Sequence, residues 1–244
     1  MPSRCRRTVV ELVRRIAADA KERGDEYSYS NLMLHTAQWE ALGRDDADEA
    51  RRALHDAMSR APPEMGLVLE WGEDQTMDLI DAYAGEAERA FRRTPRKWAW
   101  KGRSYRHYRL QRWWRAFLVG GIAATCMRDR ALARQARAVA EQYANLLAKD
   151  KDPWPRAMAA AVRAAIAFRG GDPERADALI DEAIRGFDAL GLGMYSVACR
   201  RAQGLIVGGD RGKALIDEAD TRLRAEGIAN PARFVEAFVS GFAD

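Results

Sequence analysis

The sequence GGDPERADALIDEAI, residues 170–184, contains the pattern that decides the fold, because the chain repeats it. A second copy, GGDRGKALIDEAD, begins at Gly208, and the two copies share the string ALIDEA at residues 178–183 and 214–219. A similar stretch, RDDADEARRALHDAM, begins at Arg44, and a weaker one, MRDRALARQARAVAEQYANLL, begins at Met127. Repetition of one short unit predicts an array of stacked helices.

Each copy has the features of a turn followed by an amphipathic helix. In the copy at Gly170, the glycines end one helix, and Asp172 is placed to cap the next by accepting from its free N–H groups. Pro173 follows at a first-turn position, where its missing N–H costs little. The apolar residues then recur at i, i+4, i+7, i+8 and i+11, as Ala176, Ile180, Ala183, Ile184 and Phe187. Such a stripe must be buried against a neighbouring helix, so we expect the units to stack.

Turn-forming residues divide the chain into about five helix pairs. We expect breaks near Gly24, Pro62–Pro63, Pro95, Pro153–Pro155 and Gly191, and a last helix over residues 232–240 after Asn230 and Pro231. We therefore predict an all-α fold, an α-solenoid of about five degenerate antiparallel helix pairs, forming a single domain over residues 1–244. A candidate internal break lies near residues 150–155, and an irregular helical bundle is the alternative architecture.

Composition sets the class of protein. Of the 244 residues, 48% are hydrophobic and 31% are charged, which suits a folded soluble chain with a sizeable core. The sequence has no apolar run long enough to span a membrane and no secretion signal at its start. Cys5, Cys126 and Cys199 lie far apart, which argues against a disulfide framework or a zinc site and favours a reducing cytoplasm. We therefore expect a cytoplasmic protein that needs no metal or cofactor.

The repeats resemble a known family. The tetratricopeptide (TPR) pattern has a small residue, a bulky one four positions later and an alanine three after that. Two stretches fit it, with the triplets Ala176, Ile180, Ala183 and Ala50, Leu54, Ala57. More specifically, the chain resembles the C-terminal TPR-like region of large bacterial serine/threonine protein kinases. The matching stretches are RGDEYSYSNL (23–32), WEALGRDDADEARRALHDAM (39–58), residues 171–210 and AEGIANPARFVEAFVSGF (225–242), whereas residues 62–127 depart most.

This resemblance implies a regulatory or protein-binding role in bacterial signalling. In those kinases the repeats follow a kinase domain and an ATPase-like segment, but this chain has no glycine-rich loop, HRD or DFG motif. The first helix of each TPR pair usually lines a concave, peptide-binding groove. The resemblance therefore suggests partner-binding residues on two first helices, namely Asn31, His35 and Gln38 on one and Arg106, Arg109, Arg112 and Trp113 on the other. The expected partner is a protein or peptide, acidic where it meets these arginines.

The segment RRTPRKWAWKGRSYRHYRLQRWWR, residues 92–115, supports an alternative partner. It interleaves 10 Lys/Arg, and no acid, with tryptophan and tyrosine residues. Basic residues attract phosphates and aromatic rings stack on bases, so nucleic acid or an anionic surface is the alternative. A structural interpretation competes with it, because one arc of about 140° on an α-helix would gather an apolar set for the core. That set is Leu110, Trp113, Trp114, Phe117 and Leu118, with Arg109, Arg112 and Arg115 on the solvent side.

An acidic stretch precedes the basic one. Glu70, Asp74, Asp78 and Asp81 fall on one helical face, where paired carboxylates can bind metal or transfer protons. A solvated face is the commoner explanation of such a row. A third interpretation places this helix beside the one around residues 103–127, so that their opposite charges partly neutralise.

Catalytic motifs are not apparent in the sequence. GGDRGKA, residues 208–214, is too short for a phosphate-binding loop, and Ala214 stands where magnesium would require Ser or Thr. His35, His55 and His107 are isolated and pair with no nucleophile. We therefore expect no enzyme activity, and keep small-molecule sensing in a helical pocket as a second alternative. The pattern makes no prediction about oligomeric state.

Overall fold

The structure, a computed structural model, describes residues 5–61, 66–93 and 109–242, except for the side chains of residues 5–10, 35, 37 and 66–71. The described residues form twelve α-helices and no strand, which confirms the all-α prediction. The helices are α1 (Cys5–Glu22), α2 (Glu26–Gly43), α3 (Ala47–Ser59), α4 (Gly66–Ala84), α5 (Ala87–Arg93), α6 (Arg109–Cys126), α7 (Ala133–Ala148), α8 (Pro153–Arg169), α9 (Pro173–Ala189), α10 (Gly193–Val207), α11 (Gly209–Ala225) and α12 (Pro231–Phe238). The described part of the chain holds no helix long and apolar enough to cross a membrane.

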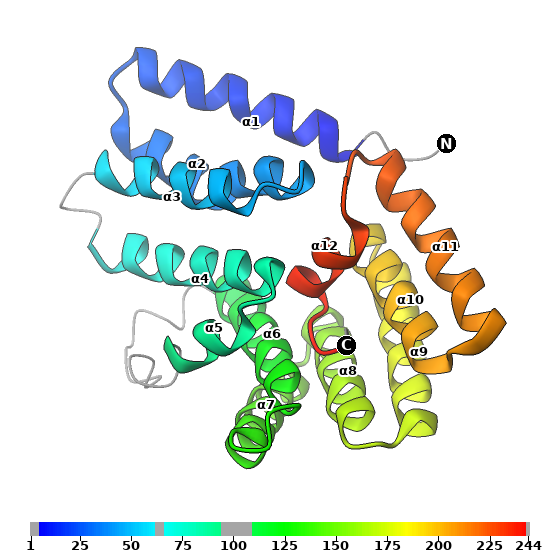
Figure 1. Cartoon of the computed structure of the whole chain (residues 1–244). Helices are drawn as coiled ribbons and strands as arrows, with labels where there is room; N and C mark the ends of the chain where they lie inside the picture. Colours follow the sequence, from blue (N-terminus) through cyan, green and yellow to red (C-terminus); the bar gives the residue numbers. More distant parts are fainter. Residues whose placement is uncertain (1–4, 62–65, 94–108, 243–244) are drawn as a thin grey trace.

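The helices follow one another in an arc from α1 to α11, with α12 on its inner side (Figure 1). Every helix packs against the next one along the chain. Helices two apart also meet, because α2 contacts α4, α4 contacts α6, and α6 contacts α8. The even-numbered helices α2 to α8 therefore form a continuous row. Each of the odd-numbered helices α3, α5 and α7 packs against the two even-numbered helices that precede and follow it in the chain.

The predicted caps explain where several helices begin. Asp46 accepts from the Glu49 N–H at 2.7 Å, Asp172 from the Arg175 N–H at 3.1 Å, and Asn230 accepts from the first turn of α12. Pro173 and Pro231 occupy first-turn positions, as expected. Such a cap is worth about 1 kcal/mol. The apolar stripes follow the sequence pattern as well, because the whole predicted stripe of α9 is buried and so are the three TPR-pattern residues of α3.

The copy that begins at Gly208 enters its helix differently from the prediction. Gly208 is the N-cap of α11 and has no side chain to accept a hydrogen bond, and Asp210 lies inside the first turn. Gly208 and Gly209 both have positive φ, 63° and 58°, so α10 and α11 join without any intervening loop. The two helices also approach closely, since a Cβ on Gly204 would lie 2.6 Å from the carbonyl oxygen of Gly212.

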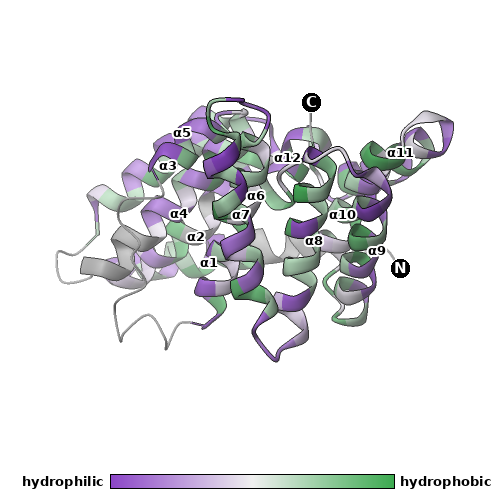
Figure 2. Cartoon of the chain, turned by 90° about the horizontal axis from the view of Figure 1, so that it is seen from below, coloured by the Kyte–Doolittle hydropathy of each residue, from purple (hydrophilic) through white to green (hydrophobic). Residues whose placement is uncertain are grey.

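One hydrophobic core runs from Leu34 to Phe242 and includes residues of every helix from α2 to α12. Hydropathy changes along individual helices, so most have both an apolar and a polar face (Figure 2). Helix α1 belongs to a separate small cluster, formed by Ala17, Ala20 and Tyr29 with Leu32 and Met33 packed against it. The N-terminal helix is therefore attached to the end of the arc rather than built into the main core.

Residues 228–242, called the C-terminal segment below, fill the inner side of the arc. Helix α12 contacts α4, α10 and α11. The Phe238 ring centroid lies 4.5 Å from that of Trp39 in α2 and 5.6 Å from that of Tyr195 in α10. The Phe242 ring lies 5.8 Å from Phe168 in α8. Figure 1 shows α12 between α4 and α10, with the C-terminal end beside α8.

Polar contacts fix the two ends of this segment. At its start, the Ala229 N–H donates to the Gly43 carbonyl at 2.8 Å. At its end, the Glu236 carboxylate accepts from the N–H groups of Gly241 at 3.0 Å and Phe242 at 3.2 Å. Gly241 has φ +112°, and a Cβ there would lie 2.6 Å from the Cβ of Ala165. The last turn therefore packs against α8 as tightly as a core helix does.

Candidate functional site: a cleft across helix α2

The inner face of the arc offers little room for a partner. Gln38, predicted to bind there, is only 4% exposed, and Trp113 is only 6% exposed, because both side chains are packed inside the protein. Neither side chain is exposed for contact with a partner in this structure. Asn31 is half-buried on α2; the His35 side chain and the whole of Arg106 lie outside the described residues. The C-terminal segment occupies the inner side of the arc.

Arg109, Arg112 and Trp113 meet around one carboxylate. Asp150, in the turn before α8, accepts from the Trp113 Nε1–H at 2.8 Å and from the Arg109 guanidinium at 3.0 Å. Arg112 lies 3.8 Å from the same carboxylate, and Arg109 also stands over the Trp113 ring at 4.9 Å. Burial opposes ionisation of Asp150, but hydrogen bonds from the Asp152 N–H, Trp113 and Arg109 outweigh it and lower its pKa. These contacts connect the start of α6 to the turn before α8.

The other described arginines of residues 92–115 are paired with acids too. Arg92 contacts Glu88 at 2.6 Å. Arg93 contacts Asp78 at 2.6 Å and Asp81 at 2.8 Å, and Arg115 lies 3.5 Å from Asp78. Residues 94–108 lie outside the described part. Each arginine of this segment that the structure describes is paired with an acidic side chain. These arginines therefore do not support the hypothesis of a surface that binds nucleic acid.

Two residues of the acidic row of α4, Asp78 and Asp81, lie in the interior. Asp78 is 1% exposed and Asp81 0%, so the interpretation as a solvated face is wrong for these two residues. The prediction that opposite charges of the two helices neutralise each other is confirmed by the Asp78–Arg115 pair, which joins α4 to α6. Burial raises the pKa of Asp78 to about 6, although Arg115 and Arg93 lower it. Buried carboxylates need such partners, because an unpaired buried charge is costly.

Two predictions for α6 are also corrected. Arg115, expected on the solvent side, is only 3% exposed, because its guanidinium pairs with the buried carboxylate of Asp78. Leu110, expected in the core, is 58% exposed in the first turn of the helix, where no neighbouring helix covers it. Phe117 and Leu118 are buried as expected. The described residues contain no group of three or more His, Cys, Asp or Glu side chains that could hold a metal ion.

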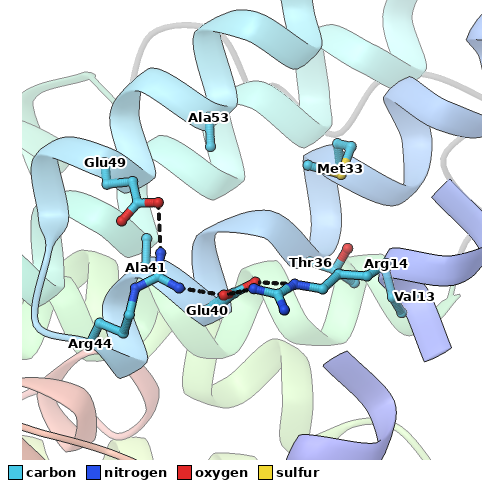
Figure 3. A pocket seen from close by; sticks show the side chains of 9 residues that line it. All are labelled: Val13, Arg14, Met33, Thr36, Glu40, Ala41, Arg44, Glu49 and Ala53. Carbon is cyan, nitrogen blue, oxygen red and sulfur yellow. Dashed lines mark hydrogen bonds and ion pairs between the residues drawn. The ribbon is translucent and has the colours of Figure 1, made fainter. Parts of the chain in front are cut away.

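An open cleft lies at the N-terminal end of the arc, where α1, α2 and α3 meet (Figure 3). Its volume is ≈ 340 Å³. The lining residues come from all three helices, namely Val13, Arg14, Met33, Thr36, Glu40, Ala41, Arg44, Glu49 and Ala53. Apolar side chains form one part of this lining and charged side chains the other. Helix α1 packs on α2 through its small separate cluster and the Arg14–Glu40 contact, and it leaves part of one face of α2 open.

Charged groups of alternating sign connect the three helices at the cleft. Arg14 of α1 donates from Nε to Glu40 of α2 at 2.7 Å, and Arg44 donates to both Glu40 and Glu49 of α3, the latter at 2.6 Å. Hydrogen bonds to Glu49 and Glu40 raise the pKa of Arg44. The Arg14 and Arg44 side chains are 62% and 49% exposed. Exposed pairs of this kind contribute roughly 0–1 kcal/mol each, so a partner can replace them at small cost.

The cleft uses a face of α2 that the sequence analysis did not select. Met33, Glu40 and Arg44 recur at the spacing of one helical face, whereas Asn31 and Gln38 lie roughly 150° around the helix from Met33. Hydrophobic periodicity does not mark the cleft, since the cleft depends on where α1 crosses α2. The Glu40–Arg44–Glu49 spacing is the one local signal that could have indicated it.

Comparison with known proteins yields no match among family models, curated proteins or solved structures. A function for the chain therefore has to be inferred from its geometry and its sequence.

Proposed function

We propose that the chain is a protein-interaction module built on TPR-like helical repeats, and that it binds a segment of a partner protein in the cleft across α2. The observation that carries this proposal is the combination of an apolar lining, from Val13, Met33 and Ala53, with an exposed row of alternating charges. Grooves that bind amphipathic helices share this combination, in which apolar anchors give affinity and charged side chains at the rim set orientation.

The open shape of the cleft favours a polypeptide over a small molecule. Small-molecule sites are mostly enclosed and bury about 70–90% of their ligand. This cleft is bounded by three helices and open to solvent, and several of its lining groups are exposed arginine and glutamate side chains. A helix lying along α2 between α1 and α3 would contact all three elements at once.

The resemblance to TPR-like regions of bacterial serine/threonine kinases supports a place in signalling. In this proposal the chain regulates or recruits a kinase or ATPase-like protein, performs no catalysis itself and works in the cytoplasm. The paired arginines of α6 support a protein partner rather than nucleic acid, because their charges are already matched by Asp150 and Asp78.

The test fills the cleft with a bulky side chain. Ala53→Trp places an indole ring in the cleft from α3, whereas Ala214→Trp adds the same ring to an exposed site on α11 at the far end of the arc. The full-length wild type and both variants, matched for helix content by circular dichroism, are used to capture proteins from the native cells. Captured proteins are identified and quantified by mass spectrometry, after nuclease treatment.

We expect at least one protein that the wild type and Ala214→Trp capture equally and that Ala53→Trp loses at least tenfold. A kinase or ATPase among such proteins would support the signalling context. Equal capture by all three chains would contradict the cleft as the binding site. Loss of every captured protein after nuclease treatment would instead favour the nucleic-acid alternative.

A further inference from the structure

The outer face of α1 carries exposed apolar side chains. The described residues include five large hydrophobic side chains that are exposed, and three of them are Leu12, Ile16 and Tyr27 at the N-terminal end of the arc. Leu12 is 52% exposed and Ile16 42%, and the two are neighbours at i, i+4 on one side of the helix. The pair therefore forms an apolar surface that the described residues leave largely uncovered.

Charged residues of alternating sign flank the apolar pair. Glu11, Arg15, Asp19 and Arg23 follow one another at intervals of four residues, and all four are exposed. Their signs run negative, positive, negative, positive along the chain. The last two form an ion pair at 2.8 Å. Because i, i+4 residues form a ridge along a helix surface, these side chains make one charged row beside Leu12 and Ile16.

The order of charges in this row is complementary to the same row of a second copy that runs in the opposite direction. When two copies of α1 lie antiparallel and are centred near residue 17, Arg15 faces Asp19 of the partner subunit and Glu11 faces Arg23 of the partner subunit. Both contacts occur twice, since a twofold interface repeats every contact. In a parallel pairing, each charge would face its own copy and repel it. We propose that the outer face of α1 is a dimerisation surface, occupied by α1 of a second copy of this chain in antiparallel orientation.

Charge and position select a second copy over other occupants. The four charges sum to zero, so the row has no net attraction for an anionic membrane or a nucleic acid. Helix α1 packs on α2 through Ala17 and Ala20, which lie roughly 140° and 80° around the helix from Leu12. The cleft residues Val13 and Arg14 lie roughly 100° and 160° around the helix from Leu12, so the proposed dimerisation surface and the proposed cleft share no residue.

The experiment exchanges charges within the row. Full-length Arg15→Glu and Asp19→Arg variants, and the double variant with both changes, are measured with the wild type by sedimentation velocity over a concentration series. We expect a concentration-dependent dimer for the wild type and at least a tenfold weaker association for each single variant, because like charges then face each other. The double variant should regain association, since reversing both signs restores the complementary row.

A mixture of the two single variants separates this geometry from any structural effect. Glu at position 15 of one copy then faces Arg at position 19 of the other, and the second contact pairs Asp19 with Arg15 of the partner subunit. The equimolar mixture should therefore form heterodimers although each variant by itself is a monomer. Ile16→Asp should also dissociate the dimer, whereas Leu110→Asp, an equally exposed leucine on α6, should leave it intact.

Three results would overturn the proposal. A wild-type chain that stays monomeric at every soluble concentration excludes the dimer. A dimer that Arg15→Glu and Ile16→Asp leave unchanged places the interface elsewhere. Single variants that dissociate while their mixture stays monomeric exclude the antiparallel pairing. Circular dichroism spectra that match the wild type would confirm that each variant remains folded.

Discussion

The C-terminal segment should behave as part of the core, and Phe234→Ala tests this most simply. Phe234 is 2% exposed, and its ring lies 6.0 Å from Trp39 and 4.8 Å from Phe238. Truncation of a fully buried phenylalanine costs about 3–5 kcal/mol, from lost apolar burial and the cavity left behind. With a urea m-value of about 3 kcal/mol/M, the unfolding midpoint should fall by about 1–1.7 M.

The assay is urea unfolding followed by circular dichroism, with Arg233→Ala as the control from the same helix. Arg233 is 55% exposed and lies 3.4 Å from Asp45, so its loss should cost no more than about 1 kcal/mol. A Phe234→Ala cost similar to that of Arg233→Ala would refute the reasoning. It would show that α12 is held loosely and that the inner face of the arc opens readily to a partner.

Three further predictions concern the interior. The pKa of Asp78 is about 6 in the folded chain against an ordinary 3.8, so its contribution to stability falls as the pH rises from about 4 to 6. In unfolding experiments at successive pH values, the wild type should lose about 3 kcal/mol of stability over that window relative to Asp78→Asn. A stability difference between the two that does not change with pH would contradict this prediction. Gly204→Ala should destabilise the chain by about 1–3 kcal/mol because its Cβ would strike the Gly212 carbonyl, whereas Gly193→Ala on the same helix has open space and should show no such loss in thermal unfolding. Burial raises the pKa of the Cys126 thiol to about 12 and raises that of Cys199 as well, so mass spectrometry after treatment with a thiol reagent should find both unmodified in the native chain and modified in urea.

Local sequence determined the helices and the starts of several of them. Asp46, Asp172 and Asn230 cap as predicted because the accepting side chain and the donating N–H are three residues apart. Ala183 and Ala219, the last residues of the two ALIDEA strings, are both buried. Ile180 is fully buried but its counterpart Ile216 only half, since α11 ends the arc and has fewer neighbours to cover it.

Long-range contacts decided what the sequence could not predict. Arg115 turns inward because Asp78, 37 residues away in sequence, is buried beside it. Gln38 is buried because the protein packs over that face of α2. The cleft itself depends on the crossing of α1 over α2 and on the Arg14–Glu40 contact, which periodicity within either helix does not reveal.

Site-specific photocrosslinking tests the binding site most directly. A photoreactive residue replaces Ala53 in the cleft in one full-length variant and Ala232, exposed on α12 at the inner side of the arc, in another. Each variant is irradiated in the native cells, and covalent adducts are identified by mass spectrometry. A cleft that binds a partner segment predicts a discrete protein adduct from position 53 and none from position 232. An adduct from position 232, with none from position 53, would contradict the account and place the partner on the inner face.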